Sequence, residues 1–371
     1  MDLSKAHNKG AMPGSAGSIA VSIRLLRDQA RRRLLRRKIF TRLPAGEPQG
    51  PSDVVECLPA KYEPAQIDRV VACGFSSTIS QEIEKLEATN YREVPLAACR
   101  LGRSMIVGGQ ILTDESRYYL GPQSPLEAMR EAPKSYDRAC VYNSALGLRY
   151  FGHWLHDDCS VREAVAGREP CISLRRPKWP DADVYETAFG HVQDQPEHAV
   201  VESLTVYADR AFSRAKAENV RALRRKLRER IAPRKKGQIV FLRRGPSAVA
   251  RHIVEEEQLI KHLDRAGIRI VDPERGTTET IEELLDAALV ISVEGSQAAH
   301  AVYCAADRGS MLILQPPDRF YNPGVEWCRM AGLSYGTVIG EAAEGGFRIH
   351  SDEVLSMVGR LTQGRAAPVH S

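Results

Sequence analysis

Two residues that can exchange a proton stand four positions apart near the middle of the chain. His153 and Asp157 lie in the segment 151–158, whose pattern predicts a helix. Residues four apart share one face of a helix, so the carboxylate can orient the imidazole or hold it protonated. His153 is then the first candidate for a general base, with Asp157 as its partner or as the base itself. In the alternative interpretation Trp154 and Leu155 pack in the core, and the polar side chains are exposed or cap the helix.

Two further groupings have the residue types of a metal site. His156 and Asp158 flank the first pair, and a metal would require all four side chains to converge. The triplet Asp181-Ala182-Asp183 is similar to the metal-binding carboxylates of some sugar-nucleotide enzymes, but it lies in a loop flanked by prolines. No metal ligand is therefore assigned, and we expect neither a metal nor another cofactor.

Polar residues collect at the ends of short apolar runs in the C-terminal half. These runs predict strands, and amphipathic helical segments separate them; the runs are 238–242, 268–271, 288–293 and 310–314. Alternating strands and helices imply a parallel sheet, whose ligands bind beyond the carboxyl ends of the strands. Those ends carry Arg243 and Arg244, Asp272, and Glu294-Gly295-Ser296.

The residues at these ends are suited to hold a diphosphate. Gly295 and Ser296 follow a buried strand and begin a helix, so their amides and the positive end of the helix attract an anion. Arg243 can offer two parallel hydrogen bonds to phosphate oxygens, and Arg251 can reach the same anion. Such cations stabilise the charge of a departing nucleoside diphosphate. In the alternative interpretation Arg243 and Arg244 form surface ion pairs.

Two residues complete the predicted donor site. Glu294 stands at the end of its strand, where it can accept hydrogen bonds from ribose hydroxyls or cap the helix together with Ser296. His300 lies on the same helix and either faces the cleft or packs in the core. No Gly-x-Gly-x-x-Gly turn follows a strand, which disfavours a dehydrogenase.

Length and composition bound the class of protein. A chain of 371 residues exceeds the size at which one core keeps growing, so we expect two domains. The eight cysteines show neither metal spacing nor a disulfide framework, which favours the cytoplasm. No apolar run reaches the length of a membrane-spanning helix.

The positive charge is concentrated at the N-terminus. Residues 1–50 carry a net charge of +8. Because the whole chain carries +5, residues 51–371 carry −3. The segment 18–40 predicts an Arg-rich amphipathic helix, which could attach to an anionic inner membrane face as a peripheral anchor. It could equally pack on its own protein or on a second subunit of a homo-oligomer. No nucleic-acid recognition motif accompanies the arginines.

These observations predict an α/β protein with five segments. We expect strands at 67–72, 105–107, 139–143 and 199–206, and helices at 80–88 and 209–230. The predicted organisation is a basic helical tail at 1–42, a Pro-rich linker at 43–64, an N-terminal α/β acceptor domain at 65–206, a Rossmann-like nucleotide-sugar domain at 207–345, and a C-terminal helix and tail at 346–371.

The order of these motifs resembles glycosyltransferase family 61 over roughly residues 138–340. The similar features are Gly-His-Trp-Leu-x-Asp at 152–157, the strand ending in Arg243-Arg244 with Arg251 beyond it, the acidic helix start at 255–257, and the strand, glycine and small residue at 294–300. The chain departs from the family pattern where His-Gly-Ala is common, since it has Glu294-Gly295-Ser296 with His300, and Thr280 stands in place of a usual Gln.

The resemblance implies a fold and an activity. A member of this family is expected to have a GT-B-like arrangement, in which two Rossmann-like domains face a cleft. It is expected to invert the anomeric centre without a metal, moving a sugar from a nucleotide-sugar donor to a polysaccharide or lipid-linked glycan, as in capsule biosynthesis. The alternatives are another polysaccharide-modifying transferase, of pyruvyl or phosphosugar groups, and a non-catalytic membrane-associated assembly protein.

Overall fold

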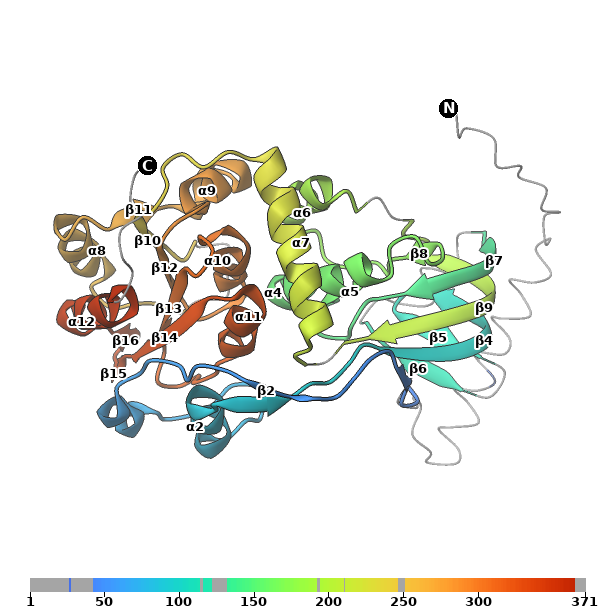
Figure 1. Cartoon of the computed structure of the whole chain (residues 1–371), viewed down its shortest axis with the longest axis horizontal. Helices are drawn as coiled ribbons and strands as arrows, with labels where there is room; N and C mark the ends of the chain where they lie inside the picture. Colours follow the sequence, from blue (N-terminus) through green and yellow to red (C-terminus); the bar gives the residue numbers. More distant parts are fainter. Residues whose placement is uncertain are drawn as a thin grey trace.

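The computed structural model describes residue 27 and residues 43–113, 116–121, 132–191, 194–209, 211–245 and 251–363. Apart from Arg27, the predicted basic helix at 18–40 lies outside these residues. Two large sheets stand at opposite ends of the molecule, and a layer of helices lies between them (Figure 1). In the described part of the chain, no helix has the length and apolar character needed to cross a membrane.

The C-terminal sheet has the predicted parallel topology. Its strands run in the order β11-β10-β12-β13-β14, and every neighbouring pair is parallel. The four apolar runs form β10 (Ile239–Leu242), β11 (Arg269–Val271), β12 (Leu289–Val293) and β13 (Ser310–Gln315). A fifth strand, β14 (Ser334–Ile339), was not predicted. The prediction of a parallel sheet is thus confirmed in this half.

Helices cover both faces of this sheet. One face packs on α8 (Glu256–Arg265) and α12 (Ser351–Thr362), and the other on α9 (Thr277–Leu284), α10 (Ala299–Cys304), α11 (Gly324–Ala331) and α7 (Arg214–Arg230). Because both faces are covered, all five residues of β12 are buried, and its sequence is a continuous apolar run broken only by Ser292. The cleft-forming polar residues are therefore confined to the strand ends.

The N-terminal sheet is mixed, and a second Rossmann-like domain is not confirmed. Its order is β6-β5-β4-β9-β7-β8, with β1 (Glu47–Pro48) also pairing with β4. The central β4 (Ala97–Val107) is antiparallel to both β5 (Gln110–Leu112) and β9 (His198–Ala208). Gly108 and Gly109 form a two-residue hairpin between β4 and β5, with Gly108 at a φ of 55°. Such a turn closes an antiparallel pair, whereas parallel neighbours need a long crossover.

The remaining strands complete this sheet on either side of β4 and β9. They are β6 (Arg117–Tyr119), β7 (Lys134–Val141) and β8 (Cys171–Ile172), of which β7 is parallel to both β8 and β9. The predicted strand at 139–143 corresponds to the end of β7. The chain then leaves the sheet toward the helical layer, which carries the catalytic candidates.

The helical layer contains the predicted His-Trp-Leu segment. It begins as α4 (Phe151–His153), widens into a π-helical turn at Trp154–Asp158, and continues as α5 (Cys159–Ala164). Alongside lie α6 (Ala182–Phe189) and α7 (Figure 1). The large buried side chains Trp154, Tyr185 and Tyr303 belong to one hydrophobic core that joins this layer to the C-terminal sheet. Packing on both sides holds the helix bearing His153 and Asp157 in place.

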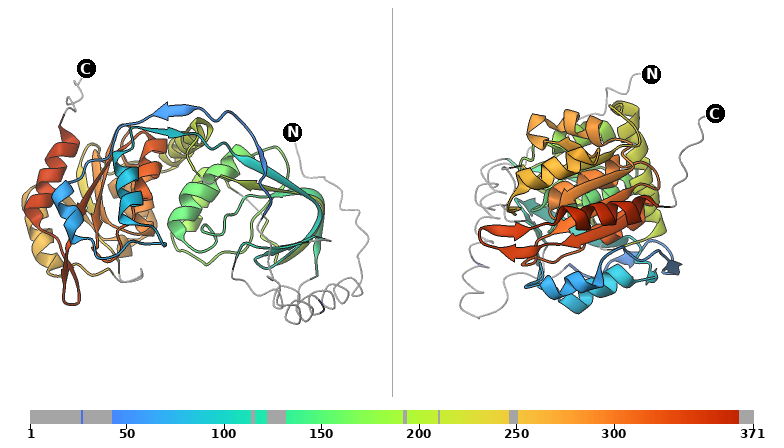
Figure 2. Two further views of the ribbon diagram at one scale, coloured as in Figure 1. Left: turned by 90° about the horizontal axis from the view of Figure 1, so that it is seen from below. Right: turned by 90° about the vertical axis from the view of Figure 1, so that its left-hand side faces the viewer.

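An N-terminal segment crosses to the C-terminal half. It contains β2 (Val54–Glu56), a 3₁₀ helix at Pro64–Arg69, α2 (Ile79–Glu87) and β3 (Asn90–Arg92), and it lies beside that half in both views of Figure 2. Lys61 pairs with the edge strand β14, since its amide donates to Tyr335 at 2.9 Å and its carbonyl accepts from Thr337 at 3.0 Å. The predicted domain boundary at residue 65 divides this segment and stays a prediction.

Local sequence explains how this segment folds. The helix predicted at 80–88 is confirmed as α2, and a capping box between Thr78 and Gln81 fixes its start. The strand predicted at 67–72 is wrong, because Pro64 occupies the first turn of a 3₁₀ helix there. The buried Gln66 of this helix accepts a hydrogen bond from the Ile339 amide of β14 at 3.0 Å, which ties the helix to the sheet.

Candidate functional site

Two adjoining cavities lie between the helical layer and the ends of the strands. The arginine cavity, of 730 Å³, has Arg244, Arg251, Gly295 and Ser296 among its lining residues. The carboxylate cavity, of 780 Å³, has Asp157, Asp158, Asp209 and Glu326 among its own. Both cavities are lined by His153, Tyr321, Pro323 and Trp327. The predicted general base therefore stands where the two cavities meet.

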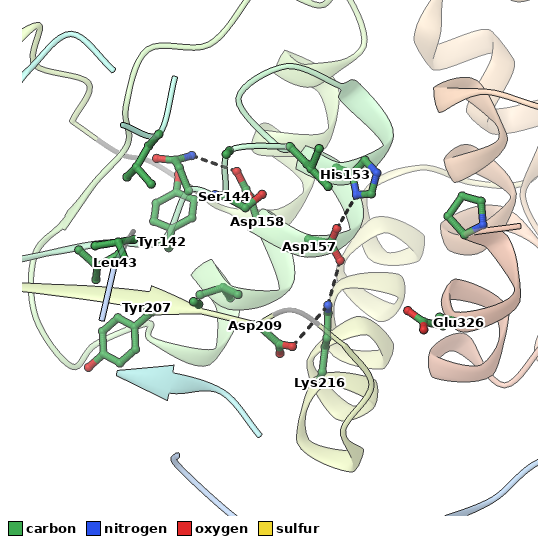
Figure 3. Close-up of a pocket in the computed structure, with 18 of the residues that line it drawn as sticks. Leu43, Tyr142, Ser144, His153, Asp157, Asp158, Tyr207, Asp209, Lys216 and Glu326 are labelled. Carbon is green, nitrogen blue, oxygen red and sulfur yellow. Dashed lines mark hydrogen bonds and ion pairs between the residues drawn. The ribbon is translucent and has the colours of Figure 1, made fainter. Parts of the chain in front are cut away.

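The predicted His153–Asp157 pair is present and is extended by a buried lysine. His153 Nδ1 lies 2.8 Å from Asp157 Oδ2. The other carboxylate oxygen, Oδ1, accepts a hydrogen bond of 2.9 Å from Nζ of Lys216, which also lies 3.6 Å from Asp209 (Figure 3). Because Nδ1 is engaged by Asp157, Nε2 is the ring nitrogen that can meet a substrate hydroxyl.

Electrostatics make Asp157 a weak base. Its burial raises the pKa, but the nearby Lys216 and the hydrogen bond with His153 outweigh that effect and leave the pKa below its usual range. The same contact acts on Lys216. Burial lowers the pKa of its amine, but the attraction of Asp157 and Asp209 outweighs burial and leaves that pKa above its usual range. Both groups are thus held charged, so the arrangement favours His153 as the group that accepts a proton and Asp157 as the group that orients it.

A glycine lets this helix lie against the strand ends. A Cβ on Gly152 would lie 3.1 Å from both the Ser296 Cα and the Trp327 side chain, so Gly152 permits close contact between α4 and the Gly295–Ser296 turn. The π-helical turn directly after His153 adds one residue to the turn, a feature that is frequent at functional sites. The Gly-His-Trp sequence therefore brings the imidazole to the wall shared by the two cavities.

His156 and Asp158 point away from the His153–Asp157 pair. His156 is fully buried against Met330 Sδ at 3.3 Å, and burial lowers its pKa to about 3, so it is neutral. Asp158 accepts hydrogen bonds from the Ser144 amide at 3.0 Å and the Asn143 side chain at 3.2 Å. Burial raises the pKa of Asp158 to about 7 in spite of these bonds. The four residues of the metal interpretation thus do not share one centre.

The arginine cavity gathers guanidinium groups around Gly295. The Arg244 Nη1 donates to the Glu294 carbonyl at 3.0 Å, and the Arg251 Nε lies 2.7 Å from the Glu294 carboxylate. A Cβ on Gly295 would collide with Arg244 and would lie 2.6 Å from Arg251. The φ of Gly295 is also +140°, so only glycine suits this position on both grounds.

The charges in this cavity are unbalanced. Arg244, Arg251 and Arg319 surround the single buried carboxylate of Glu294, from which Arg319 Nε is 3.5 Å away. Burial and the neighbouring Arg251 lower the pKa of Arg244 to about 10, at which it is still charged near neutrality. Burial also lowers the pKa of Arg251 and raises that of Glu294. An anion placed among three guanidinium groups would relieve their mutual repulsion.

Arg243 is not brought to this cavity. Its guanidinium binds Glu256 at 2.8 Å and Glu257 at 3.0 Å at the start of α8, which is the surface ion pairing of the alternative interpretation. Successive side chains of an extended strand point to opposite sides, so only one of two adjacent arginines can face the cavity. That residue is Arg244, and the predicted role of Arg243 in gripping an anion is corrected accordingly.

His300 lines the arginine cavity from a buried position. Its Nδ1 lies 2.7 Å from the Tyr185 hydroxyl, and its Nε2 lies 3.6 Å from Asp181. Asp181 also accepts a hydrogen bond of 2.6 Å from the Thr277 hydroxyl, whereas Asp183 is exposed. Among the described residues, no three His, Cys, Asp or Glu side chains gather as metal ligands would, and metal independence stays a prediction.

The sequence did not point to four residues that build these cavities. Lys216 and Asp209 come from α7 and the segment before it, Arg319 comes from the loop after β13, and Asp181 was considered only as part of a metal triplet. Lys216 Nζ reaches Asp157 across 59 positions of sequence, and no local pattern records such a contact. For Arg319 a signal existed, because it follows a buried parallel strand as Arg243 and Glu294 do.

Residues 151–311, which include His153, the strand-end arginines and Gly295, match the family described as Glycosyltransferase 61. No curated protein matches the chain. Among solved structures, the bacterial iron-containing dodecameric glycosyltransferase TibC from enterotoxigenic E. coli is similar at 10% identity and a TM-score of 0.31, over 70% of this chain and 82% of that one. The match over residues 151–311 supports glycosyltransferase family 61 for that segment and a transferase activity for the enzyme.

Proposed function

We propose that the enzyme moves a sugar, with inversion, from a nucleotide-sugar donor to a hydroxyl of a polysaccharide or lipid-linked glycan. The donor would occupy the arginine cavity and the acceptor the carboxylate cavity. The observation that carries this proposal is the position of His153, which lines both cavities at the place where they meet. A general base must stand within reach of the attacking hydroxyl and close to the sugar that receives it.

The donor's diphosphate would lie against Gly295 and Ser296. The amides at the start of this helical segment and the guanidinium groups of Arg244 and Arg251 would hold its oxygens. When the sugar leaves, these groups would stabilise the charge that builds on the nucleoside diphosphate. Because Glu294 already contacts Arg251, we propose that it orients this arginine, rather than binding ribose as the sequence suggested.

The acceptor would lose its proton to His153. Nε2 would take the proton of the attacking hydroxyl, and Asp157 would stabilise the imidazolium that forms. The ion pair with Lys216 fixes Asp157, so the imidazole is held in one orientation before the substrates arrive. Attack from the carboxylate cavity and departure into the arginine cavity would place the two partners on opposite faces of the sugar, which favours inversion.

The proposal on where the enzyme acts rests on its sequence alone. We propose that the enzyme works in the cytoplasm at the inner membrane face, with residues 18–40 binding anionic lipid. Flotation with vesicles of phosphatidylglycerol and phosphatidylcholine tests this idea. The intact chain should float with the anionic vesicles and a chain lacking residues 1–40 should not. Equal flotation of the two would contradict it.

A thermal-shift panel tests the donor proposal directly. UDP-, GDP-, CMP- and dTDP-sugars are each added to the full chain, and one at 100 times its Kd should add about 2.7 kcal/mol of stability. Arg244→Gln should reduce that protection to about 0.4–1.4 kcal/mol, the value for a Kd raised about 10–100-fold, whereas Arg243→Gln should keep it. Protection by phosphoenolpyruvate in place of every nucleotide-sugar would favour a pyruvyl transferase, and protection by none of these compounds would contradict a nucleotide-sugar donor.

A further inference from the structure

The carboxylate cavity carries an excess of negative charge in the part of the chain that the structure describes. Its described lining residues include four carboxyl groups and two amines. Both amines are already paired, because Lys216 binds Asp157 at 2.9 Å and Lys85 binds the fully buried Glu82 at 2.6 Å. The cavity therefore has little positive charge left to offer a ligand.

Two of the four carboxyl groups remain to meet a ligand. Asp157 is engaged by His153 and Lys216, and Asp158 accepts hydrogen bonds from Asn143 and Ser144. Asp209 is almost fully buried, and its Oδ1, which lies 3.6 Å from Lys216 Nζ, has no hydrogen-bond partner among the described residues.

Glu326 of α11 is the other remaining acid. It lines the same cavity, and in Figure 3 it lies across from Lys216 and Asp209. Burial raises the pKa of Glu326 and of Asp209, as is expected of carboxylates without a full set of partners.

The opposite wall of this cavity is aromatic and apolar. The N-terminal sheet and its loops contribute four tyrosines and three aliphatic side chains, which are Tyr118, Tyr119, Tyr142, Tyr207, Leu43, Leu120 and Val206. A cavity with one apolar wall and a few hydrogen-bonding groups suits a flat, amphipathic ligand. A sugar ring is such a ligand, since its C–H face can contact the tyrosines while its hydroxyls reach the carboxylates.

We propose that this cavity selects an acceptor sugar without negative charge and rejects uronic, sialic and phosphorylated sugars. The proposal rests on the proposed function, because it assumes that the acceptor binds here. Hydroxyl or ammonium groups would donate hydrogen bonds to Asp209 and Glu326. A ligand carboxylate would instead lie beside two like charges in a partly dehydrated cavity, and the repulsion should weaken its binding at least about tenfold.

Matched sugars test this selectivity. Methyl β-glucoside, β-glucosaminide and β-glucuronide differ at one substituent, and the galacto series repeats the comparison. Their affinities are measured by NMR titration of the full chain, in the presence of the nucleoside diphosphate that gives thermal protection. The neutral and amino sugars should bind at least about tenfold more tightly than the uronide of the same series. A uronide that binds equally or better, or binding by none of the six, overturns the proposal.

Two variants assign the effect to the cavity. In Glu326→Gln and Asp209→Asn the gap, meaning the difference in affinity between the neutral sugar and the uronide, should shrink to less than about threefold. One repulsive charge is removed in each variant. Asp264→Asn, which changes an exposed acid of α8, should leave the gap unchanged. Glu326→Gln is the decisive variant if Asp209→Asn unfolds, and an unchanged gap in it overturns the assignment. Intact nucleotide protection in these variants separates such a failure from a failure of the donor proposal.

Discussion

The two cavities that meet at His153 carry opposite charge. Among the described lining residues, the arginine cavity has four arginines and one lysine against three carboxyl groups, whereas the carboxylate cavity has four carboxyl groups and two amines that are already paired. A transfer reaction needs this asymmetry, because negative charge leaves on one side while a proton is removed on the other. Cations lower the cost of the first event, and carboxylates near an imidazolium lower the cost of the second. Under the proposed function, this separation of charge across His153 would favour transfer from the arginine cavity toward the carboxylate cavity.

Removing the residue between the cavities should have the largest effect. His153→Ala should lower kcat about 10²–10⁴-fold, because the attacking hydroxyl loses its general base. The Kd of the donor should change little, since the arginines remain. Steady-state kinetics with the identified donor, together with titration of the nucleoside diphosphate, separate the two quantities. His262→Ala, on the exposed face of α8, is the control, and a His153 variant with near-normal kcat would remove the residue from the mechanism.

The charge of the carboxylate cavity should be visible in stability. The folded-state pKa of Asp158 is raised by burial to about 7, above its unfolded value, so the folded state binds more protons between about pH 4 and 7. Stability from this group therefore falls as the pH rises through that window, by at most about 4 kcal/mol at 1.36 kcal/mol per pKa unit.

Urea unfolding of Asp158→Asn at pH 5 and pH 7.5 measures this contribution. The variant cannot ionise, so its stability should fall less with pH than that of the native chain. Asp183→Asn changes an exposed acid and should follow the native chain. Parallel pH profiles for the native chain and Asp158→Asn would show that Asp158 is not protonated at neutral pH.

Two adjacent arginines test the other cavity. Arg244→Gln removes a guanidinium that lines the arginine cavity, and it should weaken donor binding about 10–100-fold, the range of a lost hydrogen bond to a charged group. Arg243→Gln removes one that is paired with Glu256 and Glu257, and it should change donor affinity less than about threefold. Isothermal titration with the donor nucleotide compares them. The reverse order of effects would restore Arg243 as the anion ligand.

A strained turn at the mouth of the arginine cavity should give the smallest effect. Phe75 and Ser76 both have positive φ, of 53° and 59°, and the Phe75 ring packs 4.7 Å from that of Tyr321. Ser76→Gly should stabilise the chain by about 0.5 kcal/mol, since glycine avoids the left-handed penalty but loses more entropy on folding. Ser76→Ala keeps the strain and should show no gain in urea unfolding. Equal stability of the two variants would mean that the turn is unstrained.

Sequence patterns predicted the fold where neighbours in sequence decide it. The strands β10, β12 and β13 are runs largely buried on both faces, and such runs are readable without a partner, whereas the edge strand β11 is buried only at Val271. The strand β14 was not predicted because Gly336 interrupts its apolar pattern, and the place of that glycine is evident only from the packed structure, where a Cβ would lie 2.8 Å from the Leu361 side chain of α12. The mixed topology of the N-terminal sheet was not predicted, because β4 pairs with β9, which lies about a hundred residues away in the sequence.

The site, too, was predictable only where its residues lie close together in the sequence. The His153–Asp157 contact follows from helical spacing, and the Gly295 turn follows from its place after a buried strand. Which of two arginines faces the cavity depends on how the strand twists at its end, and sequence does not fix that. Lys216, Asp209 and Glu326 converge from separate helices and loops, so the charge of the carboxylate cavity emerged only in three dimensions.

The pairing of Lys61 with β14 has a consequence for how the protein can be divided. β14 is the last strand of the C-terminal sheet, and the chain around Lys61 and Gln66 covers its outer hydrogen-bonding groups. A fragment cut at residue 207 would expose that edge, which is a template for pairing with another copy. The C-terminal half is therefore not expected to be soluble on its own, and any exchange of it between related enzymes should include residues 60–92.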